Sequence, residues 1–110
     1  METKRTIEVT CPDCRGPLSE IQMEGIREYR CLVGHAYSPR SVLESHSEIQ
    51  ERALWSAVVA LEESANLVQT VASQFTPAIS ARLERQAEEK MRLAADVRSV
   101  LNRLEPFHFE

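Results

Sequence analysis

The chain has 110 residues and carries 13 Lys and Arg side chains against 17 Asp and Glu, a size that fits one domain or a very small domain with a helical extension. The acidic balance holds on both sides of residue 38, which excludes the basic field that gives nucleic-acid-binding proteins most of their affinity. No apolar run approaches the ~20 residues that span a bilayer, and the N-terminus lacks a signal-peptide core, so we expect a cytoplasmic protein without membrane contact.

Residues 1–38 predict a small antiparallel sheet, because they hold all three cysteines, all three glycines and several short β-type stretches. The segment TIEV at 6–9 alternates between apolar and polar residues, and PLSEIQ and IREYRC flank a turn at Glu24-Gly25. This pattern predicts three short strands joined by tight turns. A segment of this size buries too little apolar surface to offset its chain entropy, so we expect a covalent or metal staple.

The staple is predicted to be a metal site formed by Cys11, Cys14, Cys31 and His35, which follow the pattern C-x2-C-x16-C-x3-H. Thiolates and imidazoles are the ligands that zinc takes in tetrahedral sites. A sixteen-residue insertion accommodates a β-hairpin, which returns Cys31 to the first pair of cysteines. We therefore expect one structural Zn²⁺ per chain, with four protein ligands and no open position for a substrate or water.

Glycines accompany both halves of this pattern, Gly16 after the first cysteine pair and Gly34 before the histidine. Both are expected to supply the positive φ that such turns require. Two alternatives remain open: three free or buried cysteines beside an incidental histidine, and a site in which His46 replaces His35 as the fourth ligand. His108 lies between two phenylalanines near the C-terminus and is not a candidate ligand.

The helical part begins near Ser38-Pro39, which reads as an N-cap followed by proline at the first helical position. Ser41 and Glu44 have the spacing of a capping box. Further start signals follow at 45–47. The sequence therefore predicts a short helical turn over 39–45, separated from the longer helix that follows it.

Two long helices are predicted beyond that turn, over about 47–74 and about 77–104. Thr76 and Pro77 are a cap and a first helical residue between them, and the second helix should stop before Pro106. The expected fold is α+β and mostly helical. A three-stranded zinc ribbon over 1–38 is followed by a long antiparallel helical hairpin within 39–110.

Apolar residues at alternating spacings of four and three predict the seam between these helices. The first helix contributes Leu54, Val58, Leu61, Ala65, Val68, Ala72 and Phe75, and the second contributes Leu83, Ala87, Ala94, Val97, Leu101 and Leu104. The first helix is also apolar outside its seam, at Trp55, Ala57, Val59, Ala60, Leu67 and Val71. Either the ribbon covers this surplus or two chains associate as a four-helix bundle, and we expect a homodimer.

Three stretches, CPDCRGPLSEI, YRCLVGHAYSP and ALWSAVVALEESANL, resemble a bacterial module found C-terminal to chemotaxis-specific protein-glutamate methylesterase domains. The resemblance covers roughly residues 9–68. It implies a zinc-ribbon and helical module in which Cys11, Cys14, Cys31 and His35 bind the metal. It also implies a setting in bacterial sensory signalling, with a signalling protein as partner, and matches Ser38, Leu54, Trp55 and Leu61 as structural positions only.

The chain departs from that family in two ways. Leu32 stands where the usual pattern has a basic residue, and no methylesterase domain with a G-x-S-x-G nucleophile and its acid and histidine partners is present. The activity of the neighbouring domain therefore does not transfer to this chain. We expect no enzyme and no small-molecule substrate.

The expected function is a non-enzymatic zinc-binding interaction module whose helices dimerise or bind a signalling protein. One alternative is a nucleic-acid-binding zinc ribbon, which the acidic charge and scarce aromatic residues disfavour. Another is a thiol or zinc redox sensor, because an inert and a reactive site both need thiolates.

Overall fold

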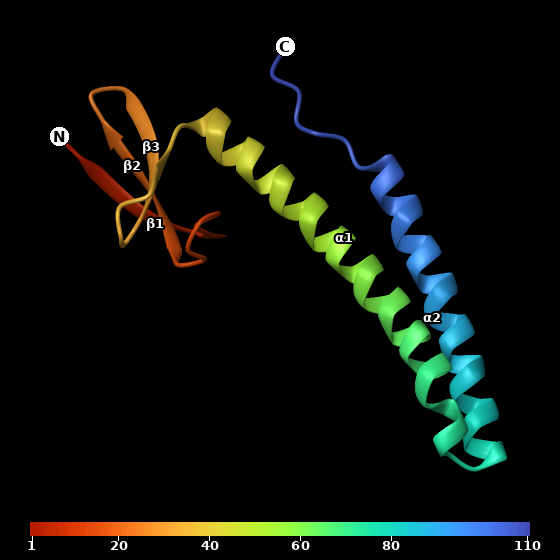
Figure 1. The fold of residues 1–110 in the computed structure, drawn as a ribbon. Helices are drawn as coiled ribbons and strands as arrows, with labels where there is room; N and C mark the ends of the chain where they lie inside the picture. Colours follow the sequence, from red (N-terminus) through yellow and green to blue (C-terminus); the bar gives the residue numbers. More distant parts are fainter. The chain divides into compact units, whose positions relative to one another are not determined.

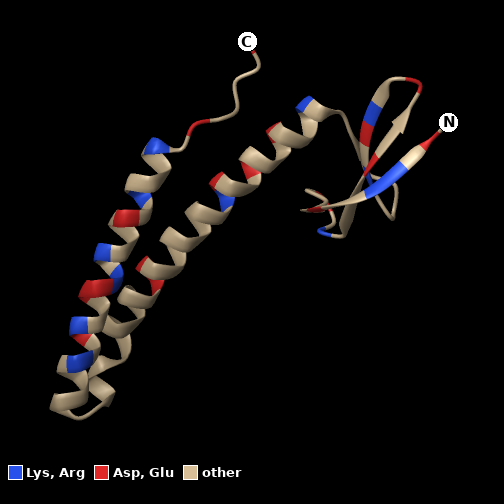
Figure 2. Ribbon diagram, turned by 180° about the vertical axis from the view of Figure 1, so that it is seen from behind, with Lys and Arg blue, Asp and Glu red and all other residues tan.

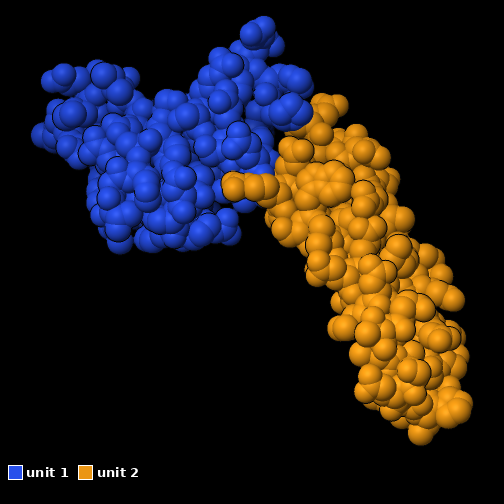
Figure 3. Space-filling model, viewed as in Figure 1, with its two compact units in different colours: residues 1–49, 106–110 blue, residues 50–105 orange.

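The computed structural model describes residues 1–110, and the fold is α+β and mostly helical, as predicted (Figure 1). The chain divides into two compact units, Met1–Ile49 with Pro106–Glu110, and Gln50–Glu105 (Figure 3). The division falls inside the first long helix. Each unit is described by itself.

The first unit contains an antiparallel sheet with the strand order β1-β2-β3-β4. Its strands are β1 (Thr3–Thr10), β2 (Pro17–Met23), β3 (Ile26–Cys31) and β4 (Ala36–Tyr37). The prediction of three strands is wrong by one. A two-residue strand carries no periodicity in the sequence, and β4 exists because the chain turns after Cys31 and pairs back onto β3.

The hairpin between β2 and β3 turns at the predicted residues. Glu24 and Gly25 have φ angles of 52° and 81°, and the flanking Met23 and Ile26 face each other across the ladder. Two consecutive positive φ angles define a type I′ turn, whose twist matches that of antiparallel strands. The turn therefore fixes the register that returns Cys31 opposite Leu18.

The core of this unit is built from Cys11, Leu18 and Cys31. Half-buried apolar side chains surround these three residues: Ile7, Val9, Tyr29, Tyr37 and Val42. Two of the three central residues are predicted metal ligands. The apolar core of the sheet is therefore small and is built largely around cysteine sulfur atoms, which fits the expected need for a staple.

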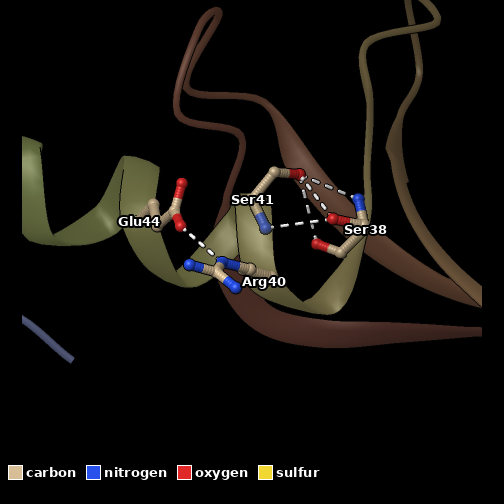
Figure 4. Close-up of polar contacts among 4 residues, drawn as sticks. All are labelled: Ser38, Arg40, Ser41 and Glu44. Atoms are coloured by element: carbon tan, nitrogen blue, oxygen red, sulfur yellow. Dashed lines mark hydrogen bonds and ion pairs between the residues drawn. The ribbon is translucent and has the colours of Figure 1, made fainter. Parts of the chain in front are cut away.

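The helix α1 (Pro39–Val71) begins with a reciprocal cap (Figure 4). The Ser41 N–H donates to Ser38 Oγ (3.0 Å), and the Ser38 N–H donates to Ser41 Oγ (2.9 Å). The capping box therefore joins Ser38 to Ser41 and not Ser41 to Glu44. Glu44 instead forms an ion pair with Arg40 at 2.8 Å. The prediction of Ser38 as the cap and Pro39 as the first helical residue is confirmed.

The predicted separation between a helical turn at 39–45 and a helix from 47 is wrong, because α1 runs without a break to Val71. No glycine or proline interrupts the chain between Pro39 and Pro77, so every backbone donor in the interval is available to the helix. Serines at 45 and 47 are tolerated inside a helix. A continuous helix also pairs more backbone N–H and C=O groups than two helices with a break between them.

A short turn joins α1 to the last helix, α2 (Pro77–Arg103). The 3₁₀ segment η1 (Ala72–Gln74) ends α1, and Thr76 Oγ1 accepts a hydrogen bond from the Ile79 N–H at 3.4 Å. The predicted cap and the proline at the first helical position are confirmed. The two helices pack as an antiparallel hairpin within the second unit (Figure 1). Neither helix is long and apolar enough to cross a bilayer.

The seam of the hairpin is made mostly of small side chains. Its fully buried members are Val58, Ala65, Ala72, Ala87 and Ala94, and half-buried residues at the same spacing extend it. Lys90 is half-buried and occupies the position where the apolar pattern of α2 is interrupted. Phe75 and Leu104 were expected in the seam, but both lie past the end of a helix and are exposed.

Replacing Gly34 by Ala should lower the free energy of unfolding of the metal-loaded protein by about 1–2 kcal/mol, because Gly34 has a φ of 102° that side chains rarely adopt. Chemical denaturation monitored by circular dichroism measures this change. The matched control is Gly16→Ala, whose added methyl group would lie in ordinary contact, 3.5 Å from Cys14 Sγ. Equal destabilisation by the two substitutions would contradict this account of the second turn.

Candidate metal centre

The four predicted ligands come together at one place in the first unit. Cys11 and Cys14 lie in the turn after β1, Cys31 ends β3, and His35 precedes β4. One ligand atom from each residue lies within 4.8 Å of all the others. The chain thus forms a group of three cysteines and one histidine suited to a single metal ion.

The distances within this group are close to those of a tetrahedral site. His35 Nδ1 lies 3.2 Å from Cys31 Sγ and 3.7 Å from Cys11 Sγ. Ligand atoms bound at ~2.3 Å for sulfur and ~2.0 Å for nitrogen stand roughly 3.5–3.8 Å apart in a tetrahedron. These two distances are near that range, and Nδ1 is the imidazole nitrogen that faces the sulfurs of Cys11 and Cys31.

Backbone hydrogen bonds shape the two turns that present these ligands. In the first, the Cys11 N–H donates to the Gly16 carbonyl (2.7 Å) and the Arg15 N–H to the Cys11 carbonyl (2.9 Å). In the second, the Cys31 N–H donates to the His35 carbonyl at 3.1 Å. Both turns are closed by these backbone hydrogen bonds, which set the direction in which each turn presents its ligands.

The glycine prediction is correct for only one of these turns. Gly34 has a positive φ of 102°, as expected. In the first turn the left-handed residue is Arg15, with a φ of 65°, and Gly16 follows it without a positive φ. Arginine tolerates the left-handed α region at a modest cost, whereas the φ of the second turn lies well outside that region.

Burial, hydrogen bonds and the neighbouring thiols determine how readily each cysteine ionises. Burial opposes the thiolate of Cys11, but Tyr37 and backbone N–H groups outweigh it and lower the pKa. Burial likewise opposes the thiolate of Cys31, and backbone N–H groups at His35 and Val33 help to lower its pKa to about 6. The backbone at Gly16 favours the thiolate of Cys14, but lost solvation and the two other thiols raise its pKa.

The contact between His35 and Cys31 Sγ also shifts the pKa of the imidazole. Its hydrogen bond to Cys31 raises the pKa of His35, while that contact is among those that lower the pKa of Cys31. Both shifts favour an imidazolium beside a thiolate across this contact. A metal ion bound here would take neutral imidazole and thiolate, so its binding would release the imidazole proton.

A tyrosine and an aspartate extend the site beyond its four ligands. The hydroxyl of Tyr37, in β4, lies within hydrogen-bond reach of Cys11 Sγ (3.3 Å) and of the Asp13 carboxylate, and its one proton is available to either acceptor. Burial and the Asp13 carboxylate raise the pKa of Tyr37, so its hydroxyl keeps its proton. Sequence reasoning missed both residues, because only the pairing of β4 with β3 brings Tyr37 to the first turn.

The other two histidines are not in the cluster. His46 Nε2, on α1, donates to the carbonyl oxygen of Thr10 at 3.2 Å, next to the first ligand. His46 therefore holds α1 to the end of β1, and the structure groups His35 with the cysteines instead. His108 lies beside a shallow pocket with Phe109, whose ring is stacked under the Arg40 guanidinium at 4.8 Å.

Comparison of the chain with protein-family models, with curated proteins and with solved structures gave no match.

Removing the Tyr37 hydroxyl with Tyr37→Phe should weaken zinc binding about 10- to 100-fold, the usual cost of losing a hydrogen bond to a metal ligand. Competition with a chromophoric chelator measures this affinity. Tyr29→Phe is the matched control, because its hydroxyl donates to Glu20 at 3.0 Å and does not touch the cluster. An unchanged affinity in Tyr37→Phe would show that this hydroxyl does not support the ligand.

Proposed function

We propose that the chain is a non-enzymatic interaction module in which structural zinc holds the N-terminal sheet and the helical hairpin binds another protein chain. The observation that carries this proposal is the closed group of three cysteines and one histidine within 4.8 Å. Four protein ligands complete a tetrahedral set, and such sites stabilise folds because no position is left for substrate.

The zinc assignment rests on the chemistry of the donor set. Thiolates select soft or borderline metals, and three sulfurs with one imidazole nitrogen are a common set for structural zinc. Calcium and magnesium prefer oxygen ligands, and a rubredoxin-like iron site asks for four thiolates. Since two of the sulfurs also lie in the core, metal binding and folding of the sheet are coupled.

The interaction role rests on the hairpin. Its seam buries mostly alanines, while large apolar side chains remain at the surface, including Trp55, Val59 and Leu67, which are 43%, 49% and 61% exposed. Exposed apolar residues that are concentrated on a helical surface are typical of protein-binding sites. We infer that a protein partner covers part of this surface and that a second copy of the chain is that partner.

The charge distribution supports a protein partner over a nucleic acid. The only basic residues of α1 are Arg40 and Arg52, and basic and acidic residues are interspersed along α2, so neither helix presents a continuous basic stripe (Figure 2). Nucleic-acid-binding surfaces gather Lys and Arg on one face. The resemblance to modules beside chemotaxis methylesterases adds bacterial sensory signalling as the setting that we propose.

Native mass measurement with metal analysis tests the zinc role. We expect one zinc per chain, lost in His35→Ala and retained in His46→Ala, because only His35 faces the sulfurs. Removal of zinc by a chelator should unfold the sheet while much of the helical signal in circular dichroism persists. A folded sheet without metal, or equal zinc loss in both histidine variants, would overturn the proposal.

A further inference from the structure

One side of α1 forms a shallow groove with an unusual arrangement of residues. Six side chains line it, at positions three and four apart along the helix: Arg52, Trp55, Ser56, Val59, Ala60 and Glu63. We call this set the outer stripe. Its middle is apolar or small, its two ends carry opposite charges, and it lies in the second unit, on residues outside the seam with α2.

The outer stripe is complementary to itself. Consider a second copy packed antiparallel, with the two-fold axis passing between residues 57 and 58. Arg52 then faces the second copy's Glu63, Trp55 faces its Ala60, and Ser56 faces its Val59, so the charges pair and the large ring meets a small side chain. A two-fold interface requires this reciprocity, because each contact must occur twice.

The charges at the ends of the stripe are free for such pairing. Neither Arg52 nor Glu63 forms an ion pair within the chain, although the adjacent Glu62 pairs with Arg98 at 3.0 Å. The two charges stand eleven residues apart, roughly 16 Å along the helix. In the antiparallel pair they form two ion pairs, one on each side of the apolar centre.

Large and small side chains alternate as this packing requires. Trp55 is 43% exposed, and the Arg98 guanidinium lies 5.3 Å from the centre of its ring, which holds the ring beside the groove. Ala60, whose side chain ends at the methyl group, leaves room for an indole from the second copy. Aromatic anchors in small-residue pockets provide much of the energy of protein interfaces.

We propose that the outer stripe of α1 is a homodimer interface, formed by two antiparallel copies of α1 in the register that pairs Arg52 with the second copy's Glu63. The occupant is a second copy because the stripe carries a basic residue at one end and an acidic residue at the other. An antiparallel copy therefore places opposite charges together at both ends. This assignment rests on the interaction role proposed for the hairpin and names the face and register that carry it out.

Charge reversal tests the register. Sedimentation equilibrium of the zinc-loaded full chain should show a dimer whose dissociation constant rises at least about tenfold in Arg52→Glu and in Glu63→Arg, because each change places like charges opposite each other twice. The double variant R52E/E63R exchanges both charges and should return the constant to within about threefold of the starting protein. Arg82→Glu, an exposed charge reversal on α2, is the control and should leave it unchanged. Helicity by circular dichroism verifies that each variant is folded.

The outcomes separate the two proposals. Rescue in the double variant supports the antiparallel register. A dimer that the single reversals do not weaken, or that the double variant does not restore, overturns the outer stripe but leaves a dimerising hairpin in place. A starting protein that remains monomeric at all concentrations overturns this interface together with the proposed partnership between copies.

Discussion

Three thiol sulfurs and one imidazole nitrogen lie within 4.8 Å of one another, and thiolates at such distances repel unless a cation lies between them. The same sulfurs are structural, because Cys11 and Cys31 pack with Leu18 as the centre of the sheet's core. A small sheet with one buried leucine at that centre buries too little apolar surface to be stable by itself. The type I′ hairpin and both closed turns bring the four candidate ligands together, and we propose that metal coordination supplies the cohesion that the apolar core lacks.

The helical hairpin of α1 and α2 is held together by a seam of small apolar side chains. Its seam buries alanines, which lets α1 and α2 approach closely but removes little apolar area from water. Larger apolar side chains consequently remain at the surface, and the hydrophobic effect favours covering them. One chain thus combines a sheet that carries a cluster of potential metal ligands with a helix that carries exposed apolar side chains. In the homodimer that we propose, the charges of Arg52 and Glu63 would determine the direction and register of the two copies of α1.

Spacing patterns predicted the parts of this structure that local chemistry determines. The ligand spacing identified Cys11, Cys14, Cys31 and His35, which the fold brings together. The Glu24-Gly25 pair identified the β2–β3 turn, because few residue pairs adopt two positive φ angles in succession. The missed features depend on contacts between distant segments. A two-residue strand has no periodicity, and no pattern in the sequence links the Tyr37 hydroxyl to the first turn. The uninterrupted α1 was missed because serine favours N-caps, whereas here the serines at 45 and 47 lie inside a helix that continues through them.

X-ray absorption at the zinc K-edge tests most directly whether a closed metal site holds this fold. The account predicts one zinc bound by three sulfurs at ~2.3 Å and one nitrogen at ~2.0 Å, with no oxygen ligand, in the folded chain. A coordination shell that contains oxygen from water, or fewer than three sulfurs, would contradict the closed site. The measurement is direct because it reads the ligands themselves and not their effect on stability.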